Sequence, residues 1–265
     1  MELRDHIKRR VEDKEIKGDG SQDFTRMYLD RIYAVKIIFN DTSFKQSVMS
    51  NCYFRNCTFI RCDFSGAHFK ECNLKGASFS ECKFEYSTWE KSQLDEHFLE
   101  DCLPPQENLA RDLVRSLRVN FAQIGNYAAV NRAAAIEVQL TGQHLYNAAY
   151  SKQSYYRKKE KNTGFARISH MAQHLQWRVL EFLWGNGESI LRVIINGLLV
   201  ILVFALILAA GEQCYKFTDA LWLSFLGFWG ETKDLPTGIR VALTISRFIL
   251  AGLFMTILVK RLSRR

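Results

Sequence analysis

The chain has 265 residues, a formal net charge of +8 and a slightly negative mean hydropathy, which by themselves describe a soluble, basic protein. These averages combine a polar first two thirds with an apolar last quarter, so we expect one compact domain and a membrane module rather than two large domains. Residues 1–33 are interpreted as a charged N-terminal segment. Its first seventeen residues lack the apolar run of a cleavable signal peptide.

Residues 34–103 are predicted to form one domain, in which the sequence repeats with a period of five from Phe39 to Leu94. A large apolar residue occupies every fifth position, and the residue two before it is almost always small. This period fits neither the 3.6 of a helix nor the 2 of a strand, and it is typical of a stacked solenoid that turns a corner every five residues. The large positions are Phe39, Phe44, Met49, Phe54, Phe59, Phe64, Phe69, Leu74, Phe79, Phe84, Trp89 and Leu94, and the small positions are Thr42, Ser47, Cys52, Cys57, Cys62, Ala67, Cys72, Ala77, Cys82, Ser87 and Ser92.

This pattern resembles the pentapeptide-repeat family, whose members fold as right-handed quadrilateral β-helices. Twelve pentads then imply three coils, about 15 Å tall at the spacing of paired strands, with ends that need capping. The resemblance implies a spacer or docking module rather than an enzyme. An acidic member that imitates DNA is disfavoured by the charge of +8.

Five of the seven cysteines occupy the small inward position of the repeat: Cys52, Cys57, Cys62, Cys72 and Cys82. We interpret them as small hydrophobic side chains in a reducing cytosol. A zinc cluster has little support, because the chain has no C-x-x-C motif and its histidines lie outside the repeat phase. We find no nucleophile–base pair or phosphate-binding loop either. The sequence therefore predicts a protein that is not an enzyme and has no cofactor or metal.

Residues 104–187 are predicted to form a cytoplasmic helical domain. Leu109, Leu113, Leu117 and Phe121 recur at four-residue spacing, as on one face of a helix. Gly125 and Asn126 interrupt this helix, and a second, alanine-rich helix runs from Tyr127 to about Lys152. Such a helical hairpin is more often a packing adaptor than a ligand site.

A basic–aromatic cluster follows this hairpin. Its members are Tyr155, Tyr156, Arg157, Lys158, Lys159 and Lys161. Three interpretations stay open: a solvated charged turn, contact with anionic lipid headgroups, or a site for an anionic nucleotide or oligonucleotide.

Two long apolar stretches lie in residues 188–265 and predict membrane-spanning helices over about 190–210 and 239–259. Either length suffices to cross roughly 30 Å of hydrocarbon. Lysine and arginine residues gather outside the two spans rather than between them, which predicts that both termini are cytoplasmic.

The segment between the spans, residues 217–231, is too apolar for a simple external loop. Asp219 is expected to cap a helix of about nine residues, too short to cross the bilayer and therefore re-entrant. The glycine-bearing residues after it would form a pore or filter: Gly227, Phe228, Trp229, Gly230 and Glu231. Phe228 and Trp229 have a second interpretation as interfacial aromatic anchors.

"FTDALWLSFLGFWGETKDLPTG" followed by "RFILAGLFMTILVKRLSRR" resembles the pore module of the potassium-channel family, which some bacterial members carry behind pentapeptide repeats. The stretches "LRVNFAQIGNY" and "WGNGESILR" resemble these members too. The resemblance implies ion transport by a homotetramer in the bacterial inner (cell) membrane. The chain lacks the T-V-G-Y-G-D-like filter, so we expect weak selectivity, with Glu231 of each subunit in a charged ring.

Arg247 is a charge within the second span, and such a residue normally faces a cavity or a partner. Helical spacing places it on one stripe with Thr244 and Ala251, next to Gly252, and we predict these four residues to line the pore. The alternative is an ion pair between subunits, with Glu231 as the partner.

Together these features predict a gated ion-channel-like membrane protein with a cytoplasmic sensor or docking domain and contact with membrane lipid. A narrower hypothesis is a pore-forming effector of bacterial antiphage (antiviral) defence, controlled by an anionic nucleotide or oligonucleotide ligand. The alternative is a non-conducting, membrane-anchored scaffold whose β-helix recruits a partner protein.

Overall fold

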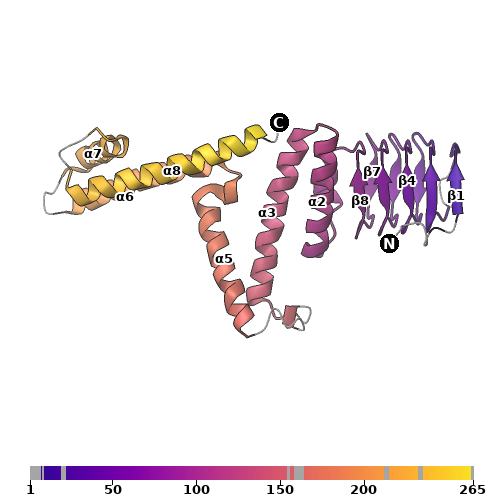
Figure 1. Cartoon of the computed structure of the whole chain (residues 1–265), viewed down its shortest axis with the longest axis horizontal. Helices are drawn as coiled ribbons and strands as arrows, with labels where there is room; N and C mark the ends of the chain where they lie inside the picture. Colours follow the sequence, from indigo (N-terminus) through magenta and orange to yellow (C-terminus); the bar gives the residue numbers. More distant parts are fainter. Residues whose placement is uncertain are drawn as a thin grey trace. The chain divides into compact units, whose positions relative to one another are not determined.

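The computed structural model describes residues 7, 9–18, 22–153, 156–157, 164–211, 215–231 and 235–263. The chain folds as two compact units, residues 1–158 and 159–265. The first contains all the strands and helices α1 to α3, and the second contains α5 to α8 (Figure 1). The predicted helical domain, residues 104–187, is therefore divided between the two units.

The first unit begins with a β-solenoid of short parallel strands. Strands 20 residues apart pair in register, for example Phe39 with Phe59 and Phe59 with Phe79. One turn of the solenoid thus takes four pentads, as predicted. One sheet has the order β1 (Arg9–Glu12), β2 (Met27–Asp30), β4 (Val48–Ser50), β6 (His68–Lys70) and β8 (Thr88–Glu90), and the other has β3 (Ile38–Asn40), β5 (Thr58–Ile60) and β7 (Ser78–Ser80).

The corners of the solenoid recur two residues after each large apolar position, and their backbone is left-handed. Asp41, Asn51 and Asn56 have φ of 47°, 54° and 57°, and Gly66 occupies the same place with φ of 70°. This conformation costs an ordinary L-residue roughly 1–2 kcal/mol, less for Asn, Asp and Gly. The stacked coils therefore hold the corners in place.

The solenoid core consists of stacked aromatic rings and inward thiols. The ring centroids of Phe44 and Phe64 lie 4.8 Å apart, and those of Phe64 and Phe84 lie 5.0 Å apart. All five repeat cysteines donate their S–H to a carbonyl 23 residues earlier, at 3.3–3.4 Å. Four of them are buried and Cys82 is half-buried, which confirms their inward placement. Burial raises the pKa of the Cys72 thiol well above its ordinary value.

The solenoid starts earlier than residue 34, because strands β1 and β2 form one more coil from residues assigned to the charged segment. Phe24, Leu29 and Ala34 continue the five-residue phase and are buried. Before Phe24 the phase slips: Val11 pairs with Leu29, only 18 residues on. The three in-phase residues are a sequence signal that the prediction missed.

Two helices cap the far end of the solenoid. Phe98, on α1 (Phe98–Asp101), packs against Phe84 and Trp89 with ring centroids 4.7 and 5.3 Å away. The buried Asn120, on α2 (Glu107–Gln123), accepts from the amide of Ser92 at 2.7 Å and donates to its carbonyl at 2.8 Å. The last edge of the sheet is thereby satisfied by side chains rather than by another strand.

Helices α2 and α3 (Tyr127–Tyr150) form the predicted hairpin, with a turn at Gly125 and Asn126. The Asn126 side chain caps α3 by accepting from the amide of Ala129 at 3.1 Å. Leu113, Val114, Leu117 and Phe121 of α2 are buried together with alanines of α3. The hairpin and solenoid therefore share one core.

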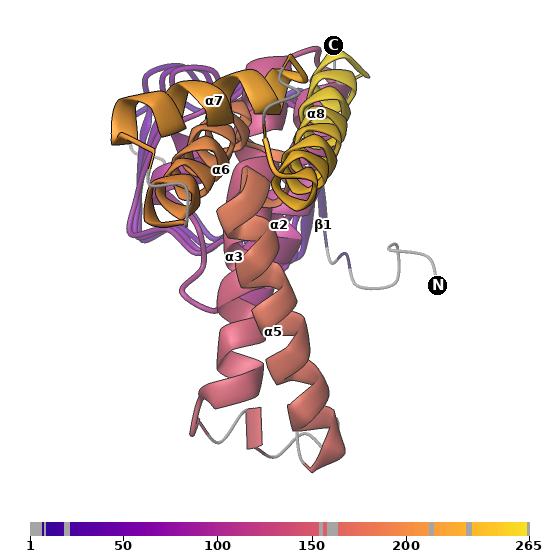
Figure 2. The same cartoon turned by 90° about the vertical axis from the view of Figure 1, so that its left-hand side faces the viewer.

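In the second unit, α5 (Phe165–Trp184) joins α6 (Ile190–Ala210) through the short helix η3 (Gly185–Gly187). Helices α6 and α8 (Thr237–Ser263) lie side by side. Figures 1 and 2 show α5 crossing one end of this pair and α7 (Phe217–Trp229) crossing the other end.

Candidate functional site

Helices α6 and α8 are long and apolar enough to cross a membrane. In the single chain, only 28% of the most apolar stretch of α6 and 17% of that of α8 are buried. A core helix of a soluble protein would be mostly covered, so the exposed apolar surface favours a lipid or protein environment outside this chain. Both helices contain the predicted spans, and α8 continues past the second span to Ser263.

Helix α7 is longer than predicted, and this corrects the interpretation of the filter as a loop. It begins after Lys216 and extends through Trp229, so Gly227, Phe228 and Trp229 are helical. Asp219 lies in the first turn rather than at the cap, where its charge interacts favourably with the helix dipole. The prediction stopped the helix at the glycine, but the apolar contacts of α7 carry the helix through Gly227.

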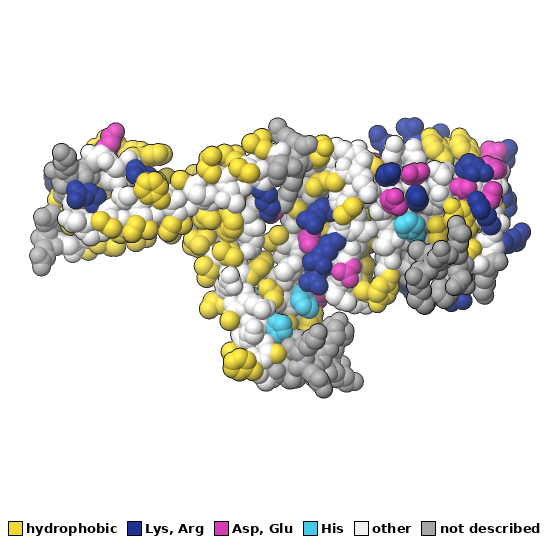
Figure 3. Space-filling model, viewed as in Figure 1, with side chains coloured by type: hydrophobic (Ala, Val, Ile, Leu, Met, Phe, Trp, Pro, Cys, Tyr) yellow, Lys and Arg dark blue, Asp and Glu magenta, His cyan; other side chains and the backbone are white. Residues whose placement is uncertain are grey.

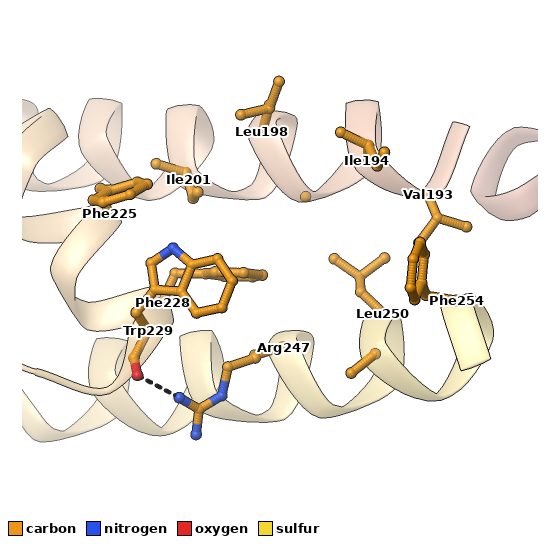
Figure 4. A pocket seen from close by; sticks show the side chains of 12 residues that line it. Val193, Ile194, Leu198, Ile201, Phe225, Phe228, Trp229, Arg247, Leu250 and Phe254 are labelled. Atoms are coloured by element: carbon orange, nitrogen blue, oxygen red, sulfur yellow. Dashed lines mark hydrogen bonds between the residues drawn. The ribbon is translucent and has the colours of Figure 1, made fainter. Parts of the chain in front are cut away.

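The turn after α7 is held by the second span. Gly230 has φ of 90°, and the Nη1 of Arg247 donates to the carbonyl of Trp229 at 2.6 Å (Figure 4). A Cβ on Gly230 would lie 2.8 Å from that Nη1. Only glycine fits both the backbone conformation and the close guanidinium. The amide of Glu231 donates to Leu226 at 3.0 Å and closes the turn.

An apolar pocket of about 330 Å³ opens beside this turn, which we call the Arg247 pocket. It lies between α6, the last turn of α7 and the middle of α8 (Figure 4). Its lining is Val193, Ile194, Gly197, Leu198, Ile201, Phe225, Phe228, Trp229, Arg247, Leu250, Ala251 and Phe254. Arg247 supplies the charge in an otherwise apolar lining.

The structure brings together only part of the predicted site. Arg247 and Ala251 line the pocket, whereas Gly252 is exposed with nothing within 4 Å of its side-chain position. Thr244 donates to the carbonyl of Arg240 at 2.9 Å, within its own helix. Glu231 is exposed, and within the described part of the chain no ion pair joins it to Arg247.

A polar corner at the other end of the spans was not predicted. Lys260 of α8 pairs with Glu188, and Arg261 donates to the Glu188 carbonyl at 2.9 Å. Arg192 of α6 pairs with Glu181 of α5. The available signal was the acidic residues Glu181 and Glu188 on either side of Gly185–Gly187, with Arg178 and Arg192 flanking them. These contacts join the end of α8 to the α5–α6 connection.

The basic–aromatic cluster lies mostly outside the described residues, namely Tyr155, Lys158, Lys159 and Lys161. Of its other members, Tyr156 is buried. Arg157 donates from Nη2 to Ala148 at 2.8 Å and from Nε to Ser151 at 2.8 Å, and so caps the end of α3. These two side chains are engaged in the fold. Among the described residues, no group of three or more metal-ligating side chains is found.

The family model described as "Pentapeptide repeat region" matches residues 33–104. The solenoid is a pentapeptide-repeat domain. Among solved structures, two trypsin-treated variants of QnrB1, a plasmid-mediated fluoroquinolone resistance protein, are similar to part of the chain. The first has 15% identity and a TM-score of 0.17 and covers 35% of this chain and 63% of the QnrB1 chain. The second has 13% identity and a TM-score of 0.20 and covers 34% and 55%.

This chain therefore spans less than two thirds of the length of either QnrB1 structure. A comparison with curated proteins finds no match. The matched residues end within the first unit, so the arrangement of α6, α7 and α8 is interpreted from its own geometry.

Proposed function

We propose that the chain is a channel-like membrane protein in which several copies, four by the resemblance of the module, surround one pore. The observation that carries the proposal is the turn at Gly230. It lies beside Arg247, ten residues after Thr237 and hence about 15 Å into α8 at the helical rise. Non-helical backbone at such depth is tolerated only where it is covered by protein or lines a water-filled cavity.

Several copies of the chain are needed to enclose a pore. Two spans cannot enclose a water pathway, and α8 exposes Phe248 by 66% and Ile249 by 56% of their surface. A rotationally symmetric ring closes when each copy contacts the next through two different surfaces. The expected particle is a C4 tetramer. A mass measurement in detergent that gave monomers across a wide concentration range would contradict the pore.

Arg247 is the residue on which we place gating or ion preference. Its guanidinium has five N–H donors, and one contact to the Trp229 carbonyl leaves others to face an ion path or an anionic blocker. Replacing Arg247 by leucine is expected to alter ion preference or gating and to leave the tetramer intact. Arg240→Leu, two turns nearer the start of α8 on the same stripe, tests whether the second arginine contributes to the same effect.

Planar-bilayer recording of the purified protein is the decisive measurement. We expect weakly selective conductance, changed in size by Trp229→Ala and in cation preference by Glu231→Gln. Strict selection of potassium over sodium would contradict the proposed filter. A tetramer that conducts under no condition would favour the non-conducting scaffold instead.

The first unit is proposed to be the cytoplasmic sensor or docking part, with both termini in the cytoplasm. Control by an anionic nucleotide or oligonucleotide, and a role in antiphage defence, rest on the basic–aromatic cluster of the sequence. Titration of the tetramer with short oligonucleotides during recording tests this part. A shift in open probability would support control by such a ligand. An unchanged open probability would contradict this control but not the proposed pore.

A further inference from the structure

Helix α5 lies across the direction of the two spans. It appears upright in Figures 1 and 2, whereas α6 and α8 run along the horizontal axis of Figure 1 and point toward the viewer in Figure 2. Only five residues separate α5 from α6, the three of η3 followed by Glu188 and Ser189. If α6 stands upright in a bilayer, α5 therefore runs along the membrane plane.

One side of α5 exposes an apolar stripe. Phe165, Ile168, Leu175, Val179 and Phe182 are exposed by 50–86% of their surface, and none of the residues of α5 is fully buried. With the exposed Ala172 between Ile168 and Leu175, the spacing alternates between three and four residues, which keeps all six side chains on one side. Figure 3 shows hydrophobic side chains along the edge of α5 on the side toward which α6 and α8 extend.

The crossing orientation is held by contacts within the second unit. The Asn196 side chain, on α6, donates to the carbonyls of Phe182 and Leu183 at 2.9 and 3.0 Å, and so caps the end of α5. Arg192 binds both the carboxylate and the backbone carbonyl of Glu181. These hydrogen bonds fix the angle between α5 and α6, and with it the direction that the apolar stripe faces.

We infer that α5 is an interfacial helix that lies on the membrane surface, with the stripe from Phe165 to Phe182 at the boundary of headgroups and acyl chains. Exposed apolar stripes on helices in the interface plane bury about 5–10 Å deep. Arg178 beside the stripe suits anionic headgroups. The inference rests on the membrane placement of α6 in the proposed function, not on conduction.

A second copy of α5 is the competing occupant, since the same spacing is found along coiled-coil seams. A coiled coil along the axis of a tetramer would need α5 to run with the spans. The observed helix runs across them, so the α5 helices of a symmetric ring would not run parallel to its axis. The bilayer surface is the occupant that this direction fits.

The test uses the full chain in phosphatidylcholine vesicles, labelled with an environment-sensitive fluorophore at single introduced cysteines. Leu175→Cys places the label on the stripe, and Gln173→Cys places it on another exposed side of the same helix. Leu199→Cys, near the middle of α6, reports whether the spans are in the bilayer. The unsubstituted chain, labelled alongside, gives the background from its own cysteines. Quenchers are lipids brominated near the top of their acyl chains, lipids brominated deep in them, and aqueous iodide.

We expect the Leu175 label to have blue-shifted emission and to be quenched by shallow brominated lipid, and the Gln173 label to be quenched mainly by iodide. Quenching of the Leu175 label by iodide would overturn the inference. Quenching by neither would also overturn it, because the stripe would then be covered by protein, a second copy included. If the Leu199 label escapes deep brominated lipid, the spans themselves are misplaced and the proposed function fails with the inference.

Discussion

The pentapeptide-repeat solenoid buries its large apolar side chains, whereas the two-span unit leaves many of them exposed. In the solenoid, Phe39, Phe54 and Phe64 are at most 1% exposed, because each ring packs against other aromatic rings of the core. In the two-span unit, Leu198 and Phe248 are 62% and 66% exposed. One chain completes the first core, whereas the second unit needs lipid or further copies to cover its surface.

The two units also differ in which side chains supply hydrogen-bond partners to backbone groups at the end of an element. The last edge of the solenoid is satisfied by the neutral, fully buried amide of Asn120, which both donates and accepts. The end of α7 is satisfied by the charged Arg247, which only donates. Under the proposed membrane placement, a charge at that depth has a cost that a neutral side chain would avoid, which is why the proposal gives Arg247 a functional role.

The largest expected effect tests whether the solenoid core is complete. Phe64→Ala should lower the free energy of unfolding of the solenoid by about 3–5 kcal/mol, because the stacked rings leave a cavity that cannot collapse. Hydrogen exchange of solenoid amides in the full chain measures this loss. Ile38→Ala, at an exposed strand position, is the control and should change the free energy by less than about 0.5 kcal/mol. Equal losses would show that the core is not the source of stability.

The cap at Asn120 gives the next largest effect. Asn120→Ala leaves the amide and the carbonyl of Ser92 buried without partners, at about 1–3 kcal/mol for each group. Protection of the β8 amides should fall, whereas the adjacent exposed Val119→Ala should leave it unchanged. If both variants behave alike, the edge is satisfied in another way.

The corresponding test in the two-span unit is Gly230→Ala. The positive φ and the 2.8 Å approach of Arg247 should together destabilise the turn by more than about 1 kcal/mol. Gly238→Ala is the matched control, since nothing lies within 4 Å of its side-chain position. Exchange of the Gly230 and Glu231 amides in reconstituted protein measures the change. Unaltered protection in Gly230→Ala would contradict the contact with Arg247.

The smallest effect concerns the inward thiols. Cys72→Ala removes one S–H donor and little volume, so we expect a loss of about 1 kcal/mol. Reaction of the five repeat cysteines with a water-soluble thiol reagent should be slow at neutral pH, because they face inward and the thiolate is the reactive form. Rapid labelling of all five in the native protein would contradict their inward placement.

Two buried thiols, Cys72 inside the solenoid and Cys102 after its last coil, predict how stability depends on pH. Burial raises the pKa of Cys72 well above the ordinary value of 9.0 and raises that of Cys102 to about 12. Above pH 9 the unfolded chain loses these protons while the folded chain keeps them, so the stabilisation present below pH 9 decreases as the pH rises toward 12. Hydrogen exchange at pH 8 and pH 10, corrected for the intrinsic rate, should show this decrease, and Cys102→Ala should reduce it.

The sequence by itself determined the solenoid from Phe39 to Leu94, because a five-residue period sends the same positions inward in every coil. It also determined the two long apolar helices, since length and composition decide which helices are able to cross a bilayer. It did not determine the first coil, where a slip of two residues between β1 and β2 breaks the period before Phe24.

Tertiary structure alone decided the contacts between segments far apart in the chain. Asn120 meets Ser92 across 28 residues, and Arg247 meets Trp229 across 18. Neither pair follows a period. The left-handed Gly230 marks the end of α7, whereas the continuation of the helix through Gly227 depends on packing against α6 and α8. Local spacing says which side of an element a residue occupies, but only the packed helices and strands decide what lies opposite it.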